Sequence, residues 1–165
     1  MGWRTIGLMV ENRSASEVLL ALPGNPSPTG ETRVGDEALS MSLDTDYALA
    51  EVGGWTVVSD PKVAVACDSD ACGSLSASGG RVLTFIMDTS TTTYAFFWYV
   101  DGRHVRTAAY VEGEPAELVG EPLAEEAELP ERWSEDFVPE IAHRLTGAWN
   151  ENLFETSFAL HRTAT

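Results

Sequence analysis

Four residues within nine positions carry side chains that proteins use to hold an anionic or planar ligand: Trp98, Tyr99, His104 and Arg106. Arginine stacks on aromatic rings and forms paired hydrogen bonds to carboxylates and phosphates. Histidine can move a proton near neutral pH. One interpretation is therefore an anion pocket, in which Arg106 binds the ligand and His104 transfers a proton.

The same residues have a structural interpretation, which we favour. The Asp-Gly pair at 101–102 lies between two alternating runs, and it predicts a hairpin because both central residues of a type I′ turn need positive φ. Residues 94–100 are apolar on both faces, as in a strand that is buried on both sides. The aromatic rings would then form cross-strand core pairs, and Arg106 would form a salt bridge. Strict alternation along 103–110 places His104 and Arg106 on one face.

Carboxylates in the acidic segment 112–131 are the second group of candidates. Glu125, Glu126 and Glu128 could perform acid–base chemistry or bind basic groups, although a run of carboxylates in a loop is usually a solvated surface. The segment contains three prolines and almost no periodicity. It is therefore expected to be a long surface loop, with 117–119 as its one candidate strand.

No motif identifies a reaction, a metal site or a cofactor. The three histidines, His104, His143 and His161, fall in separate expected elements, and a metal site would require all three to converge. A phosphate-binding glycine loop and a dinucleotide fingerprint are both absent from the sequence. We predict no cofactor, no metal and no catalytic residue, so the enzyme question stays open with a preference for a non-enzymatic protein.

Cysteine usage and hydropathy indicate a cytoplasmic protein. Cys67 and Cys72 are too few for a disulfide framework and are expected to be free thiols, with a local disulfide as the alternative. The N-terminal apolar run is shorter than a signal-peptide core, and no stretch approaches the length of a membrane span.

The formal charge of −16 is the strongest global feature of the sequence. It argues against nucleic acid and anionic membranes as partners, because their phosphates would be repelled. The charge is uneven: residues 1–60 carry nine acids and three bases, residues 112–165 carry thirteen and three, and residues 61–111 carry four of each. Such flanks favour a basic protein partner or simply solubility. Nothing in the sequence indicates the oligomeric state.

The elements that must position these residues indicate an α+β fold in a single domain, residues 1–165. Strands are expected at 3–10, at 55–59 and across 81–111, where they form a central three-stranded antiparallel meander. We predict one antiparallel sheet of about five to seven strands with helices packed on one face. Segment 23–37, which is rich in proline and glycine, is expected to be a second long surface loop.

The C-terminal region is expected to supply a helix and one further strand. Ser134 would cap a helix of roughly 14 residues. Its apolar stripe follows helical spacing and comprises Phe137, Ile141, Leu145 and Trp149. Residues 156–162 alternate and would return to the sheet as an edge strand.

Two stretches of the chain resemble a group of known sequences. These are Gly54-Trp55-Thr56-Val57, and a hairpin with Asp101, Gly102, Arg103, Val105 and Arg106 that is followed by Gly120-Glu121-Pro122-Leu123. They resemble uncharacterised small acidic α+β proteins that are frequent in high-GC Gram-positive bacteria. The resemblance covers about half of the chain and implies a fold, but no activity.

These observations favour a non-enzymatic acidic interaction protein, for example one like an immunity protein or antitoxin that covers a basic protein. The alternatives are a small-molecule-binding protein or enzyme with an anion pocket at His104 and Arg106, and a nucleic-acid mimic. The mimic would require carboxylates of 112–140 to line up on one surface.

Overall fold

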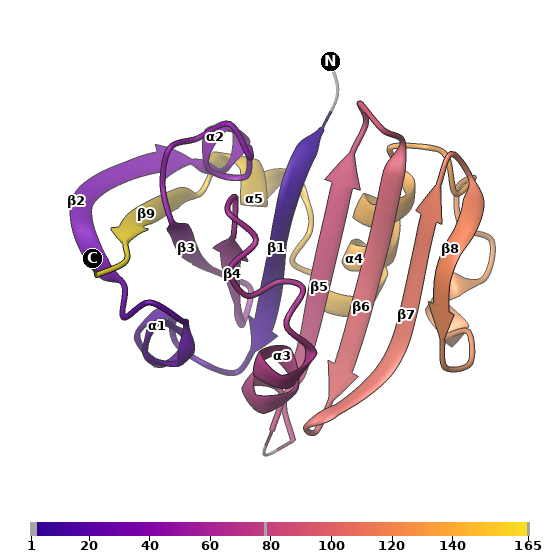
Figure 1. Ribbon diagram of the computed structural model, residues 1–165, viewed down its shortest axis with the longest axis horizontal. Coiled ribbons are helices and arrows are strands. Elements are labelled where there is room, and N and C mark those ends of the chain that lie inside the picture. Colours follow the sequence, from indigo (N-terminus) through magenta and orange to yellow (C-terminus); the bar gives the residue numbers. More distant parts are fainter. Residues whose placement is uncertain (1–2, 78, 165) are drawn as a thin grey trace.

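One antiparallel sheet of nine strands organises the computed structural model, which describes residues 3–77 and 79–164 (Figure 1). The order across the sheet is β2-β9-β3-β4-β1-β5-β6-β7-β8. The strands are β1 (Arg4–Glu11), β2 (Ser27–Val34), β3 (Tyr47–Val52), β4 (Trp55–Ser59), β5 (Arg81–Asp88), β6 (Thr93–Val100), β7 (Arg103–Val111), β8 (Glu114–Val119) and β9 (Ser157–Arg162). The predicted single antiparallel sheet is confirmed, but five to seven strands were too few.

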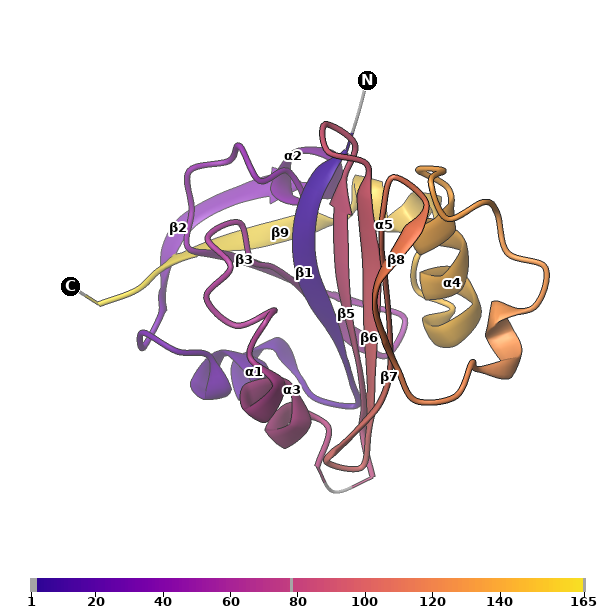
Figure 2. The same cartoon turned by 45° about the vertical axis from the view of Figure 1, so that its right-hand side comes forward.

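Helices cover both faces of this sheet, so the prediction of helices on one face is wrong. One face of the sheet packs against α2 (Gly35–Ala38), α4 (Phe137–Thr146) and α5 (Glu151–Glu155), and we call it the α4 face. The opposite α3 face packs against α1 (Ala15–Ala21) and α3 (Ser69–Leu75). Figure 2 shows the central strands from the side, with α4 on one side and α1 and α3 on the other. Two helical layers are needed because the central strands carry large apolar side chains on both faces.

The predicted meander across 81–111 is confirmed as the consecutive strands β5, β6 and β7. The two residues of the β6–β7 turn, Asp101 and Gly102, have φ of 50° and 80°. These are the left-handed values that a type I′ turn requires. Both faces of β6 are largely buried: Phe96 and Trp98 lie in the core of the α4 face, and Tyr99 lies in the core of the α3 face.

Both edge strands lie in segments that the sequence predicts to be loops. Strand β2 lies within 23–37, and β8 lies within 112–131. Each edge strand contains a proline, Pro28 or Pro115, and an irregularity in its register. An edge strand tolerates proline because one side of its backbone has no strand partner. The same features make both edges poor templates for pairing with another sheet.

The last strand is not at an edge, contrary to expectation. Strand β9 pairs with β2 on one side and with β3 on the other. Segment 156–162 does return to the sheet, but β2 covers the side that was expected to be free.

Helix α4 confirms the predicted apolar stripe with different ends. Phe137, Ile141, Leu145 and Trp149 are all buried in the core of the α4 face. The helix ends before Trp149 because Gly147 adopts a left-handed conformation with φ of 68° and caps it. In the part of the chain that is described, no helix has the length and apolarity to cross a membrane.

Acid is expected to weaken the attachment of the C-terminal segment to the start of β3. Asp46 accepts hydrogen bonds from Lys62 Nζ at 2.7 Å and from the Thr163 backbone N–H at 2.8 Å. The Lys62 hydrogen bond is the main reason that the pKa of Asp46 lies below its ordinary value of 3.8. The ionised carboxylate therefore adds stability above pH 3.8, and this is lost as pH falls through the lower pKa of the folded state.

Asp46→Asn should therefore lower the urea midpoint at neutral pH and reduce its difference between pH 7 and about pH 2.5. Asp36→Asn, at an exposed position without an ion pair among the described residues, is the matched control. An unchanged pH dependence in Asp46→Asn would contradict this assignment.

Candidate functional site

Arg106 and Glu126 form a buried ion pair between strand β7 and the segment that follows β8. The guanidinium donates from Nε to Glu126 Oε2 and from Nη2 to Glu126 Oε1, both at 2.9 Å. The two side chains are only 5% and 7% exposed. Two of the predicted binding residues are therefore partners of each other in a bidentate pair.

Further hydrogen bonds around this pair hold the backbone in place. Arg106 Nη1 donates to Gly120 O at 2.9 Å, and Leu123 N donates to Glu126 Oε2 at 2.6 Å. Gly120 has a φ of 75°, and a Cβ at this position would lie 2.1 Å from Val105 O. Only glycine fits such an approach. A ligand anion would have to displace Glu126 to reach the guanidinium, so the pair acts as a structural clamp.

His104 lies on the opposite face of the sheet from Arg106. The register pairs Trp98 with Arg106 and Tyr99 with His104. Trp98 and Tyr99 are adjacent on β6 and point to opposite faces of the sheet, so their cross-strand partners do so too. The prediction that His104 and Arg106 share a face is wrong, because a bulge at Val105 interrupts the alternation of β7. The four aromatic, histidine and arginine candidates therefore do not line one pocket.

His104 stacks on Tyr99 at the border of the α3 face. The ring centroids are 4.9 Å apart with an interplanar angle of 26°, and His104 Nε2 lies 2.5 Å from Thr107 Oγ1. Tyr99 is buried, and this burial raises the pKa of its hydroxyl. The pair is thus an aromatic stack that covers the end of a buried strand, with the imidazole on the solvent side.

Trp98 belongs to a different cluster, on the α4 face. The ring centroids of Trp98 and Trp55 are 6.4 Å apart. The Arg81 guanidinium lies 5.7 Å from the Trp98 centroid and 5.4 Å from the Trp55 centroid. Arg81 also forms a salt bridge with Glu11. The cation that stacks on Trp98 is therefore part of the protein itself.

Residues 112–131, which we call the acidic strap, include β8 and the short 3-10 helix η1 (Ala124–Glu126). The strap carries eight carboxylates, and the sequence has no Lys, Arg or His between Arg106 and Arg132. Glu126 is buried against Arg106. The other seven are exposed and form no salt bridge within the part of the chain that the structure covers; they are Glu112, Glu114, Glu117, Glu121, Glu125, Glu128 and Glu131.

Two arginines next to the strap bind its backbone and leave its side chains free. Arg144 Nη1 donates to Glu125 O at 3.0 Å and to Ala127 O at 2.5 Å. Arg132 donates to Pro130 O at 3.0 Å, and its guanidinium lies 4.9 Å from the Phe137 ring centroid. Together with Arg106, these contacts hold the second half of the strap on the molecule while its carboxylates stay in solvent.

The remaining candidates show no convergence. His143 Nδ1 lies 3.1 Å from Trp149 O, and His161 lies on β9. Among residues 3–77 and 79–164, no group of three or more His, Cys, Asp or Glu side chains could hold a metal ion. Cys67 and Cys72 are free, as expected, and burial raises the pKa of the Cys72 thiol to about 11. Cys72 is therefore protonated at neutral pH.

Strand β8 was largely missed by sequence reasoning, although a signal for it exists. Glu112 and Gly113 form a second two-residue turn with φ of 52° and 81°. The turn pairs Val111 with Glu114 and places three strap carboxylates on or beside a regular strand. An x-Gly pair after an alternating run indicates a hairpin, but the proline at 115 concealed the strand that follows.

Comparison of the chain with family models, curated proteins and solved structures finds no significant match. The resemblance to small acidic bacterial proteins therefore stays a prediction. The residues that carry it include Arg106 of the hairpin and Gly120 of the later segment, which the structure brings together in the clamp.

Proposed function

We propose that this protein is an acidic interaction protein that binds a basic protein partner through the acidic strap. The proposal rests mainly on seven exposed strap carboxylates that form no salt bridge within the described residues, on a chain of formal charge −16. Uncompensated carboxylates attract a basic surface and speed its association. Immunity proteins and antitoxins are examples of this kind of function.

The attachment of the strap supports the proposal. Arg106 and Arg144 hold strap carbonyls, so the backbone that carries Glu121, Glu125 and Glu128 is ordered before any partner arrives. A preorganised surface loses less conformational entropy on binding than a flexible loop does. Arg106 pairs with Glu126 and Arg144 pairs with Glu140, so neither forms a salt bridge with an exposed strap carboxylate.

The anion pocket, which was the main alternative, has less support. The residue expected to bind the anion, Arg106, is paired with Glu126. The residue expected to transfer a proton, His104, lies on the other face of the sheet. A pocket with both functions would require β7 to lose its bulge. We therefore retain the interaction function as the proposal.

The test is affinity capture with two charge-matched variants. The strap variant is Glu121→Gln/Glu125→Gln/Glu128→Gln, and the control variant replaces three exposed carboxylates elsewhere: Asp36→Asn/Asp70→Asn/Glu155→Gln. Each removes three negative charges. Immobilised wild-type protein should retain one basic protein from a lysate of its own source at low salt and release it at moderate salt.

The strap variant should lose most of this partner, and the control variant should keep it. Equal retention by the two variants would show that only net charge matters and would contradict a role for the strap. A column that retains no basic protein would remove the proposal.

A further inference from the structure

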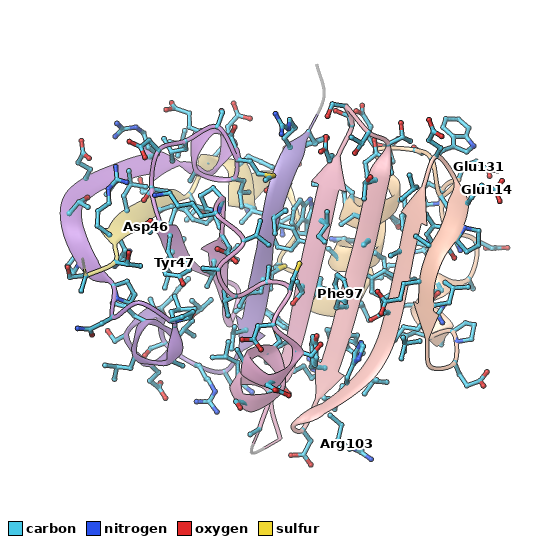
Figure 3. The ribbon with its side chains drawn as sticks, in the orientation of Figure 1. Asp46, Tyr47, Phe97, Arg103, Glu114 and Glu131 are labelled. Atoms are coloured by element: carbon cyan, nitrogen blue, oxygen red, sulfur yellow. The ribbon has the colours of Figure 1, made fainter. Side chains whose placement is uncertain are left out.

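The α3 face of strands β5 to β8 is only partly covered by the protein's own helices. In Figure 1, α3 lies in front of the lower ends of β1 and β5, and β6, β7 and β8 have no helix of the described chain in front of them. Phe97 points to this side and is labelled in Figure 3. By contrast, α4 and the part of the strap that follows β8 lie on the α4 face of these strands (Figure 2).

The register shows which side chains form this open face. Cross-strand partners share a face, so one row runs through Thr84, Phe97, Thr107 and Val119. The next row runs through Ile6, Ile86, Ala95, Ala109 and Glu117, and the outermost through Arg4, Asp88, Thr93, Val111 and Glu114. The centre of the face is apolar, and its β8 border is acidic.

Exposure increases across the face toward β8. Thr84, Ala95 and Thr107 are buried, Ile86 and Phe97 are half-buried, and Val111 and Val119 are 42% and 36% exposed. Beside them, Glu114 and Glu117 are exposed and form no salt bridge within the described residues. The opposite corner of the face carries the ion-paired Arg4 and Asp88. A largely apolar centre with an acidic border on one side is typical of a protein-binding site.

We infer that the open face, with Phe97 and Val119 in its apolar centre and Glu114 and Glu117 on its border, binds an amphipathic basic helix of the partner. This inference rests on the proposed function and specifies the partner's contact segment. Helices already pack on the covered parts of both faces of this sheet, which makes a helix the complementary element. A helix about 10–12 Å across matches the width from β6 to β8, since neighbouring strands are about 4.8 Å apart.

The negative charge of the β8 border favours a basic partner over a second copy of this chain. Two copies that met with β8 against β8 would bring Glu114 and Glu117 of each copy together. Lysines and arginines beside the apolar stripe of a helix would instead meet these carboxylates. The helix of the partner is therefore basic, with its apolar stripe on Phe97 and Val119.

The experiment uses synthetic helical peptides as probes. The first has leucines at helical spacing and lysines elsewhere; the second is a scrambled peptide of the same composition; the third has glutamate in place of lysine. Binding to the full-length protein is measured by fluorescence anisotropy at low and moderate salt. The first peptide should bind at least about tenfold more tightly than the other two, on the scale of a hot-spot contact.

Two lysine variants separate the open face from charge alone. Val119→Lys should weaken binding of the first peptide about tenfold, while Leu20→Lys, at an 89% exposed position on α1, should leave it unchanged. Phe97→Ser should also weaken binding, and Glu114→Gln/Glu117→Gln should reduce its salt dependence. Thermal unfolding of each variant confirms that it remains folded.

Other outcomes would overturn the inference. Equal binding of the scrambled peptide, or equal effects of Val119→Lys and Leu20→Lys, would show that the peptide binds through negative charge alone and not through the apolar centre of the open face. Tight binding of the glutamate peptide would exclude a basic partner helix. A wild-type dimer in sedimentation that Val119→Lys abolishes would assign the face to self-association. Loss of the captured partner in the strap variant but not in Val119→Lys would leave the proposed function intact and remove only this inference.

Discussion

Arg106→Ala is expected to destabilise the protein by about 3–5 kcal/mol, the usual cost of removing one partner of a buried ion pair. Glu126 would remain as a buried carboxylate, and Gly120 O would lose its hydrogen bond from the guanidinium. The expected result is a lower urea midpoint, measured by circular dichroism, with an early loss of hydrogen-exchange protection in residues 119–126.

Two further variants test the cause of this effect. Arg103→Ala removes an exposed arginine from the same strand, at the hairpin end in Figure 3, and should change stability little. Arg106→Met/Glu126→Leu replaces both charges with apolar side chains and should recover the part of the loss that comes from the unpaired charge, while Gly120 O and Leu123 N still lose their hydrogen bonds. A double variant no more stable than Arg106→Ala would show that the charge left on Glu126 is not the cause.

Asp60→Ala is expected to destabilise the protein by about 3 kcal/mol or more. Asp60 directly follows strand β4 and is fully buried. Its carboxylate accepts the backbone N–H groups of Ala64, Val65 and Ala66, each at 2.8 Å. Each buried donor that loses its acceptor costs about 1–3 kcal/mol. Val65 and Ala66 also lie in the core of the α3 face, so the loop they share would lose its anchor there.

The matched control is a second aspartate that binds backbone N–H groups. Asp68 is exposed and accepts one hydrogen bond, from Ala71 N at 3.1 Å, as the N-cap of α3. Asp68→Ala should cost about 1 kcal/mol, the usual value of an N-cap. The cost of Asp60→Asn should fall between those of Asp68→Ala and Asp60→Ala. Its side-chain NH₂ group would replace one accepting oxygen and would face a backbone N–H donor. Equal denaturation midpoints for Asp60→Ala and Asp68→Ala would contradict the importance of the three-donor arrangement.

Much of the fold follows from local patterns. Asp101-Gly102 predicted the hairpin, alternation predicted two-sided burial of β6, and helical spacing predicted the stripe of α4. Each pattern depends on residues close together in the chain. Strand β2 and the first half of β8 were missed because their prolines and glycines are typical of loops. A sequence does not show that a segment will lie at an edge, where such residues are tolerated.

The candidate site depended on two facts that alternation does not reveal. One extra residue, Val105, moved His104 to the face opposite Arg106. The partner of Arg106 was one of eight carboxylates in the strap, and it lies twenty residues along the chain. Local spacing does not distinguish Glu126 from its neighbours, because the choice is made by the path of the strap over β7. The residue types were recognised as important, but their role changed from binding to clamping.

The position of β9 between β2 and β3 has a consequence for how the chain is made. Ribosomes synthesise roughly 100 residues between β3 and β9, which takes about 5–20 seconds at 5–20 residues per second. During that time β3 has an open edge, since β9 is its only neighbour on that side. Strands β5 to β8 are joined by short turns and can pair as soon as they emerge, because local contacts form fastest. The β2-β9-β3 part of the sheet is therefore expected to assemble last in the cell.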